Sequence, residues 1–185
     1  PGNPYYTPLD RIPLAMQQAV MTGEDGDFYQ HKGFYPEAFR RSLAQNYRQG
    51  KFARGGSNIT MQLVKNVFLH PRKTIARKAE ELLITWIIEN QRITSKARMM
   101  EVYLNVIEMG KGVFGAEAAA QFYFNKSARN LSRRESALIA ACLPNPVRYK
   151  VKSGSRYVQS RASVIQRQMM NLQSDPVIRK LIENR

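Results

Sequence analysis

Apolar residues recur with the 3.6-residue period of an α-helix along most of this chain, and this periodicity constrains the fold more than any other feature. Three groups of residues define such helical faces. They are Ile75, Ala79, Leu82, Leu83, Trp86 and Ile87; Met99, Val102, Tyr103 and Val106; and Val158, Ala162, Ile165 and Met169. No long alternating pattern of the kind found in half-buried strands is present, so we expect at most a short hairpin. The sequence therefore predicts a mainly α fold.

One further helix has a clear start signal. Ser132 is followed three residues later by Glu135, which is the spacing of a capping box. This predicts an apolar helix over 135–143 that ends before Pro144. The only cysteine, Cys142, lies in this apolar run, so no disulfide can form within the chain. We expect Cys142 to be a small buried hydrophobic residue and not a nucleophile.

Length and charge limit the possible organisation and partners. The 185 residues favour a single domain over 1–185. A net charge of +15 predicts an anionic partner, which could be nucleic acid, an anionic membrane surface or a phosphorylated substrate. No apolar stretch reaches the ~18 residues that span a bilayer. Because the sequence begins at Pro1 and not at Met, we expect any membrane anchor to lie outside it.

Three charged or glycine-rich segments suggest a chemistry. Glu24 opens an acidic cluster, Gly55-Gly56-Ser57 is a small-residue turn, and Arg77, Lys78 and Glu81 lie within one helical turn. A carboxylate such as Glu24 can accept a proton from a hydroxyl group. Cations such as Arg77 and Lys78 can hold a departing phosphate. Together these residues suit the transfer of a sugar from a phosphate leaving group to a hydroxyl, with Glu81 orienting the cations.

Each segment also has a simpler interpretation. Arg77 and Glu81 are four residues apart and could form an exposed ion pair worth a few tenths of a kcal/mol. The glycine pair could be an ordinary turn, and the acidic cluster could decorate a helix end. His31 is expected to be a structural histidine, and no spacing typical of a zinc site surrounds it or His70, so no metal site is predicted.

Residues 35–54 form a separate basic and aromatic segment. Tyr35, Phe39, Leu43 and Tyr47 recur every four positions, with arginine and lysine residues among them. A basic amphipathic helix of this kind can lie on an anionic bilayer. Periodicity alone favours the simpler interpretation, in which the stripe faces the core and the cations face water.

The order and spacing of these motifs resemble the peptidoglycan glycosyltransferases of glycosyltransferase family 51. That family includes monofunctional transglycosylases and the glycosyltransferase domains of class A penicillin-binding proteins. The matching segments are 24–33, 55–66, 77–81 and 96–105, with a looser match over 161–165. The family usually has threonine where this chain has Asn58 and commonly glutamine where it has Met61. We expect these two departures to tune the site and not to abolish it.

The resemblance implies a lysozyme-like fold with a larger lobe and a small membrane-facing lobe that includes 35–54. It implies that Glu24 is the general base, which deprotonates the 4-hydroxyl of the acceptor lipid II. That oxygen would attack the donor sugar with inversion, and undecaprenyl pyrophosphate would leave. Glu81 matches the second essential glutamate. The implied substrate-binding residues are Arg41, Ser57, Gln62, Lys65, Lys73, Arg77 and Lys78.

The resemblance also implies partners and a location. The partners would be lipid II, the growing glycan strand and the membrane surface, with other cell-wall synthesis proteins as candidates and no nucleic acid. The location would be the outer, periplasmic face of the bacterial cytoplasmic membrane. No cofactor is obligatory, although Mg²⁺ at the pyrophosphate is compatible with this chemistry.

Three other functions compete with this one. A lysozyme-like glycoside hydrolase also uses carboxylates, but its leaving group carries no phosphate and needs no row of cations. A basic nucleic-acid-binding domain would place its cations in a stripe with base-reading aromatics, whereas here they cluster with carboxylates. An inactive scaffold would not need both Glu24 and Glu81.

Overall fold

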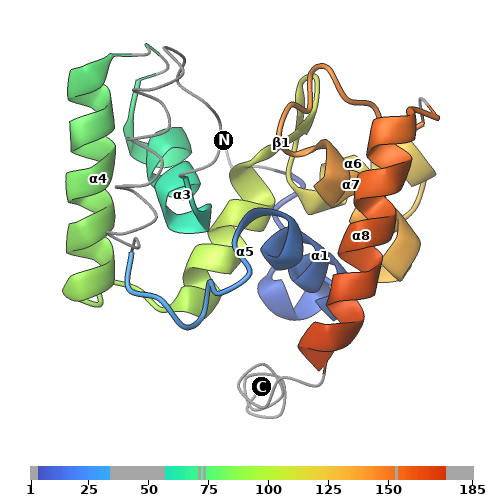
Figure 1. The fold of residues 1–185 in the computed structure, drawn as a ribbon, viewed down its shortest axis with the longest axis horizontal. Helices are drawn as coiled ribbons and strands as arrows, with labels where there is room; N and C mark the ends of the chain where they lie inside the picture. The colour runs from blue at the N-terminus through green and yellow to red at the C-terminus, as the bar shows by residue number, and fades with distance from the viewer. Residues whose placement is uncertain (1–3, 34–56, 71, 73, 153, 174–185) are drawn as a thin grey trace. The chain divides into compact units, whose positions relative to one another are not determined.

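A computed structural model describes residues 4–33, 57–70, 72, 74–152 and 154–173. Within these residues the chain is mainly helical, as the periodicity predicted (Figure 1). In chain order the elements are η1 (Leu9–Arg11), α1 (Leu14–Glu24), α3 (Ile59–Phe68), α4 (Ile75–Asn90), α5 (Lys96–Val106), β1 (Glu108–Gly110), β2 (Val113–Phe114), α6 (Ala116–Phe124), η2 (Ala128–Asn130), α7 (Arg133–Cys142) and α8 (Arg156–Gln173). The segment 35–54, Arg41 and Lys73 lie outside the described residues.

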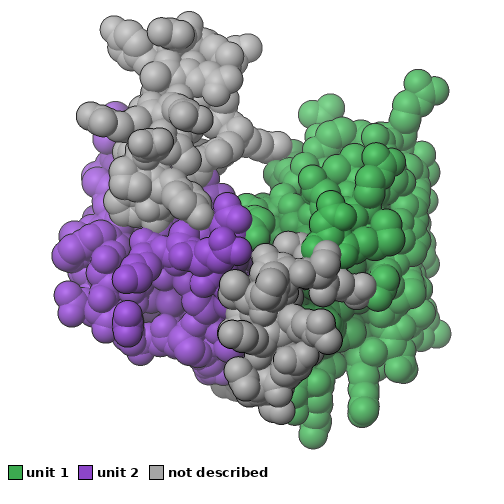
Figure 2. Space-filling view, turned by 60° about the horizontal axis from the view of Figure 1, so that its bottom comes forward, with its two compact units in different colours: residues 1–26, 104–185 green, residues 27–103 purple. Residues whose placement is uncertain are grey.

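The chain divides into two compact units (Figure 2). Unit 1 consists of residues 1–26 and 104–185, and unit 2 consists of residues 27–103. The division falls within α5. The single domain expected from chain length stays a prediction.

The core of unit 1 is built from α1, α7 and α8, which pack against one another (Figure 1). All four residues of the predicted late face on α8, from Val158 to Met169, are buried. Ile165 packs closely against α1, since a Cβ added to Gly23 would lie 3.4 Å from the Cδ1 atom of Ile165. Burial of each large apolar side chain stabilises the fold by roughly 1.5–3 kcal/mol.

The predicted capping box begins α7. The Ser132 hydroxyl accepts a hydrogen bond from the Glu135 backbone N–H, and the Glu135 carboxylate accepts one from the Ser132 N–H. The helix begins at Arg133, two residues before the predicted range. Burial disfavours ionisation of Glu135, but hydrogen bonds from Lys126 and Ser132 outweigh that effect and lower the pKa of the Glu135 carboxyl.

Cys142, at the end of α7, is buried as predicted. Burial raises the pKa of its thiol to about 11. The thiol is therefore protonated at neutral pH, which agrees with a packing role and not with a nucleophilic one.

A short antiparallel hairpin follows α5, in agreement with the expected limit on strand content. Its turn contains Gly112 at φ +71°, and the Gly112 N–H donates to the Glu108 carboxylate at 2.9 Å. Gly115 leads into α6 at φ +85°, and a Cβ there would lie 2.8 Å from the carbonyl oxygen of Asn105. Only glycine combines this backbone conformation with so close an approach.

The N-terminal lead-in is held to unit 1 by Asn105. The Asn105 amide accepts from the Thr7 N–H at 2.7 Å and donates to the Thr7 carbonyl at 2.9 Å. Beyond Thr7 the chain forms the single 3₁₀ turn η1 before α1 begins.

In unit 2, α3 packs against α4 (Figure 1). The face that α4 buries is polar. Glu81, Thr85 and Glu89, spaced four residues apart, are its buried residues. The apolar face predicted from sequence lies on the other side, where Leu83 and Trp86 are exposed and Ile75 is 82% exposed. The helix itself was predicted; its orientation was not. Among the described residues, no helix is both long enough and apolar enough to span a membrane.

Candidate active site

Glu81 is the centre of a charged cluster on α4. Its side chain is only 2% exposed, and each carboxylate oxygen has its own cation. Arg77 Nη1 donates to Glu81 Oε2 at 3.2 Å, and Lys78 Nζ donates to Glu81 Oε1. The i to i+4 pair predicted from sequence therefore forms, but around a buried carboxylate and not on an exposed helix face. Such a carboxylate is suited to orienting cations.

Ser57 joins this cluster from the segment before α3. Lys78 Nζ also donates to the Ser57 hydroxyl oxygen at 3.2 Å, which links the start of α3 to the first turns of α4. The N-cap of α3 is Asn58, whose side-chain oxygen accepts from the Met61 N–H at 2.9 Å. The Asn58 amide also donates to the Gly33 carbonyl. Asn58 can thus cap the helix as a threonine would, and Met61 is fully buried.

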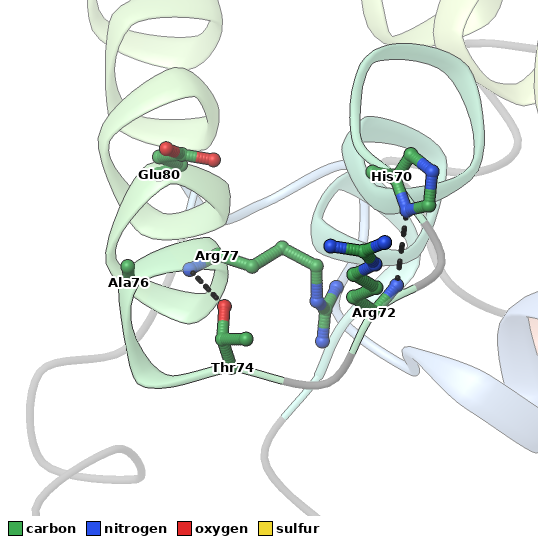
Figure 3. Close-up of a pocket in the computed structure, with 6 residues that line it drawn as sticks. All are labelled: His70, Arg72, Thr74, Ala76, Arg77 and Glu80. Atoms are coloured by element: carbon green, nitrogen blue, oxygen red, sulfur yellow. Dashed lines mark hydrogen bonds between the residues drawn. The ribbon is translucent and has the colours of Figure 1, made fainter.

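A cationic pocket of about 400 Å³ opens beside this cluster, at the N-terminal end of α4 (Figure 3). It is lined by His70, Arg72, Thr74, Ala76, Arg77 and Glu80. The Arg77 side chain extends from α4 toward the segment that carries His70 and Arg72. Its Nε atom is buried and makes no hydrogen bond to a described residue. The Thr74 hydroxyl caps α4 by accepting from the Arg77 N–H at 3.1 Å. Cations at a helix N-terminus favour an anionic ligand.

Two other predicted residues lie on α3. The Gln62 side-chain oxygen accepts from the buried Tyr103 hydroxyl of α5 at 3.0 Å, so this contact orients the amide. Lys65 is exposed in the last turn of α3. The structure brings together Ser57, Arg77, Lys78 and Glu81, and it places Gln62 and Lys65 on α3.

Glu24 is the last residue of α1 and belongs to unit 1. Its side chain is 11% exposed, and its Oε1 lies 3.6 Å from Nη2 of Arg161 on α8. The same Nη2 donates to the carbonyl oxygen of Gly23 at 2.8 Å. A cation at the C-terminal end of a helix is electrostatically favourable there. Arg161 therefore contacts both the last turn of α1 and the carboxylate of Glu24 at its end.

Sequence reasoning assigned no role to Arg161, Glu89 or Lys96, and it treated Thr60 only as a possible donor to phosphate or sugar oxygens. Glu89, Lys96 and Thr60 belong to a buried group in unit 2 and are joined by hydrogen bonds. Arg161 and Lys96 each lie inside a segment that matched the family, and that was the available signal. No pattern in the sequence, however, pairs Glu24 with Arg161, which is 137 positions away, or Glu89 with partners on two other helices.

His31 behaves as the structural histidine that was expected, since it is buried and its ring meets the edge of Phe28 at a centroid distance of 6.2 Å. In the part of the chain that the structure describes, no group of three or more His, Cys, Asp and Glu side chains could hold a metal ion.

Comparison with known proteins identifies the family. A sequence profile described as transglycosylase matches residues 2–170. The chain belongs to the transglycosylase family. Its relatives include proteins named biosynthetic peptidoglycan transglycosylase from Aromatoleum aromaticum (48% identity over 82% of this chain), Thiobacillus denitrificans (44% over 89%) and Acinetobacter baumannii (42% over 89%).

These matches confirm the family predicted from the motifs, and with it the assignment of the chain to the enzyme class of peptidoglycan glycosyltransferases. The aligned region covers 65%, 70% and 72% of the length of the three relatives, so this chain spans about two thirds of the transglycosylases it matches. The roles of individual site residues stay predictions.

Proposed function

We propose that this chain polymerises lipid II into glycan strands. The observation that carries the proposal is the cluster of Arg77, Lys78 and Ser57 around the buried Glu81, beside a cationic pocket. Two cations share one carboxylate, so the cluster keeps a net positive charge. This arrangement suits a pyrophosphate leaving group, because charge-assisted hydrogen bonds to phosphate oxygens are strong. A glycan hydrolase, whose leaving group is a sugar hydroxyl, has no comparable use for it.

In the proposed reaction Glu24 is the general base. Its carboxylate accepts the proton of the 4-hydroxyl on the acceptor GlcNAc. The oxygen then bonds to C1 of the donor MurNAc on the face opposite the pyrophosphate, which inverts the configuration. The bond between C1 and the pyrophosphate oxygen breaks, and its electron pair leaves with undecaprenyl pyrophosphate. Arg161 Nη2 lies 3.6 Å from Glu24 Oε1 and would help to hold the carboxylate in place.

The donor is proposed to bind through the unit 2 cations. Arg77 and Lys78 would contact the pyrophosphate, with Lys65, Arg41 and Lys73 adding positive charge and Ser57 and Gln62 contacting sugar or phosphate oxygens. The start of α4, which lies beside the pocket, supports this assignment. The Thr74 side chain caps only the Arg77 N–H, and the other N–H groups of a first helical turn have no partner within the helix and attract anions.

Incubation with fluorescently labelled lipid II, followed by separation of the products by size, tests the proposal. We expect a ladder of products longer than the substrate and release of undecaprenyl pyrophosphate. Shortening of pre-formed glycan strands, without growth from lipid II, would instead support a hydrolase. Binding of nucleic acid without either reaction would support the third alternative.

We further propose that unit 2 contacts the membrane through the exposed apolar face of α4. Leu83, Trp86 and Ile75 are exposed on this face, and a substrate with a lipid tail lies in the bilayer. An amphipathic surface flanked by cations binds anionic lipid surfaces. The location would be the outer, periplasmic face of the cytoplasmic membrane.

Vesicle binding tests this membrane contact. The double change Leu83→Ser and Trp86→Ser should reduce co-sedimentation with phosphatidylglycerol vesicles. The matched control is Phe114→Ser with Phe122→Ser, which removes two exposed aromatic side chains from unit 1. Equal binding by the two double variants would contradict a membrane contact at α4.

Two accompanying proposals concern cofactors and partners. Mg²⁺ is proposed as an optional ion on the oxygens of the donor pyrophosphate, where it would add to the positive charge of Arg77 and Lys78; polymerisation measured with and without EDTA tests this. Other cell-wall synthesis proteins are proposed as partners, to be sought by cross-linking in bacterial membranes.

A further inference from the structure

Glu89 lies at a point where several segments of unit 2 meet. It belongs to α4, is buried, and uses one oxygen for two hydrogen bonds. Oε1 accepts from the Thr60 hydroxyl of α3 at 2.6 Å and from Lys96 Nζ of α5 at 2.6 Å. A single carboxylate oxygen thereby joins three helices.

The loop 27–33, which follows the proposed base in the sequence, is held at the same place. Lys96 Nζ lies 4.5 Å from the centroid of the Phe28 ring, within the range of a cation–π interaction. Gly33 has φ +91°, and a Cβ there would lie 3.3 Å from both Cβ and Cγ of Glu89. The loop backbone therefore packs directly on the stem of the Glu89 side chain.

The network contains no residue of the proposed substrate site, but it fixes the helices that carry that site. Thr60 is three residues after Ser57 on the segment that forms α3, and Glu89 is eight residues after Glu81 on α4. At 1.5 Å per residue, Glu89 is about 12 Å along the helix from Glu81. The two helices are thus joined at two separated points: Lys78 with Ser57, and Glu89 with Thr60. Two such points fix both the distance and the register of the helices.

We propose that Glu89 is a positioning residue for sugar transfer, which holds α3, α4, α5 and the loop 27–33 in the arrangement that orients Ser57 and Glu81. This inference rests on the proposed function. Burial of a charge pair and a hydroxyl is a costly way to stabilise a core, since well-packed apolar residues stabilise it equally well or better. The hydrogen bonds add a fixed arrangement of the segments that they join, because hydrogen bonds are directional.

The experiment compares Glu89→Gln with the double variant Glu89→Gln and Lys96→Met. The single change leaves Lys96 without its carboxylate, which lowers the Tm; the double change removes both charges and should restore much of it. If Glu89 positions the site, kcat for lipid II polymerisation should fall about 10- to 100-fold in both variants, because a small misplacement of the reacting groups slows the reaction strongly. KM should change less than kcat. Assays are run well below each variant's Tm.

Hydrogen exchange supplies a readout that needs no substrate. Amides of 27–33 and of the first turn of α3 should exchange faster in the double variant, while α7 and α8 of unit 1 should be unchanged. Glu101→Gln is the matched control, because it removes the glutamate of an ion pair with the exposed Arg98 on α5. Normal kcat in the double variant, or unchanged exchange in 27–33, would overturn the proposal. If Glu89→Gln fails to fold, kcat and hydrogen exchange are measured in the double variant and in Thr60→Val instead.

Absence of polymerisation by the unmodified chain would reject the proposed function and not the network. The exchange measurement would still show whether Glu89 orders the loop 27–33 and the start of α3.

Discussion

The two glutamates predicted to carry the chemistry have different surroundings. Glu81 in unit 2 is 2% exposed, and its two oxygens hold Arg77 and Lys78 within hydrogen-bond range. Glu24 in unit 1 is 11% exposed, and its contact with Arg161 is 3.6 Å, longer than a hydrogen bond between charged groups. The two carboxylates therefore differ in how they are held: two cations lie within hydrogen-bond range of Glu81, and one arginine lies at a longer distance from Glu24.

The largest expected effect comes from Glu24→Gln, which removes the proposed base and nearly preserves its shape. Polymerisation of labelled lipid II should fall by ~10² to 10⁴, the usual contribution of a positioned base. The Tm should change little. Asp27→Asn, at an exposed acid three residues away, is the control and should retain activity. Full turnover by the Glu24→Gln variant would show that Glu24 is not the base, and the proposed difference in role between Glu24 and Glu81 would then be wrong.

Glu81→Gln should separate the two glutamates on stability. It weakens two charge-assisted hydrogen bonds in a buried position, so we expect the free energy of unfolding to fall by about 1.5–3 kcal/mol. Glu24→Gln weakens an ion pair at 3.6 Å, beyond hydrogen-bond range, so we expect the smaller loss of the two. Urea unfolding of both variants measures this. Equal losses would mean that the two carboxylates are held equally firmly.

The cations of the Glu81 cluster sharpen the comparison further. Arg77→Ala and Lys78→Ala should each weaken use of the lipid II donor, by about 1.5 kcal/mol or more if the lost contact is charge-assisted. Glu80→Ala is the control on the same helix, because Glu80 is exposed and is not one of the matched positions of the 77–81 motif, which are Arg77, Lys78 and Glu81. Glu80 lines the same pocket but carries the opposite charge. Kinetics at varied lipid II concentration test this, and a loss in Glu80→Ala as large as in the two cation variants would show that the motif had been misaligned.

The smallest expected effect comes from a third glutamate, Glu135, which lies outside the proposed site. The pKa of Glu135 is lowered in the fold, so its ionised form contributes stability above the unfolded pKa of ~4.3, and this contribution disappears as the pH falls through the folded pKa. Glu135→Gln keeps a side chain that can complete the capping box but loses the charge paired with Lys126. We expect a loss of about 0.5–1 kcal/mol at pH 7 that vanishes at strongly acidic pH. A pH-independent difference in unfolding free energy would contradict this.

Sequence by itself determined the helical class, the capped start of α7, the late helix α8, the buried Cys142 and the family. Periodicity and capping are local, since they depend on residues within one or two helical turns, and ordered motifs identify a family without any coordinates. The pairing of Arg77 and Lys78 with Glu81 is of the same local kind, because all three lie within one turn of α4.

Only the tertiary structure decided which face of α4 is buried. Periodicity finds an apolar stripe and cannot say whether it meets protein, and here the buried stripe is Glu81, Thr85 and Glu89. Glu89 can be buried on α4 because its partners arrive from other helices, Thr60 from α3 and Lys96 from α5. In the same way, Arg161 of α8 reaches Glu24 at the end of α1. Burial of a charge is unfavourable without such partners, and their meeting depends on how the helices pack, which no local pattern encodes.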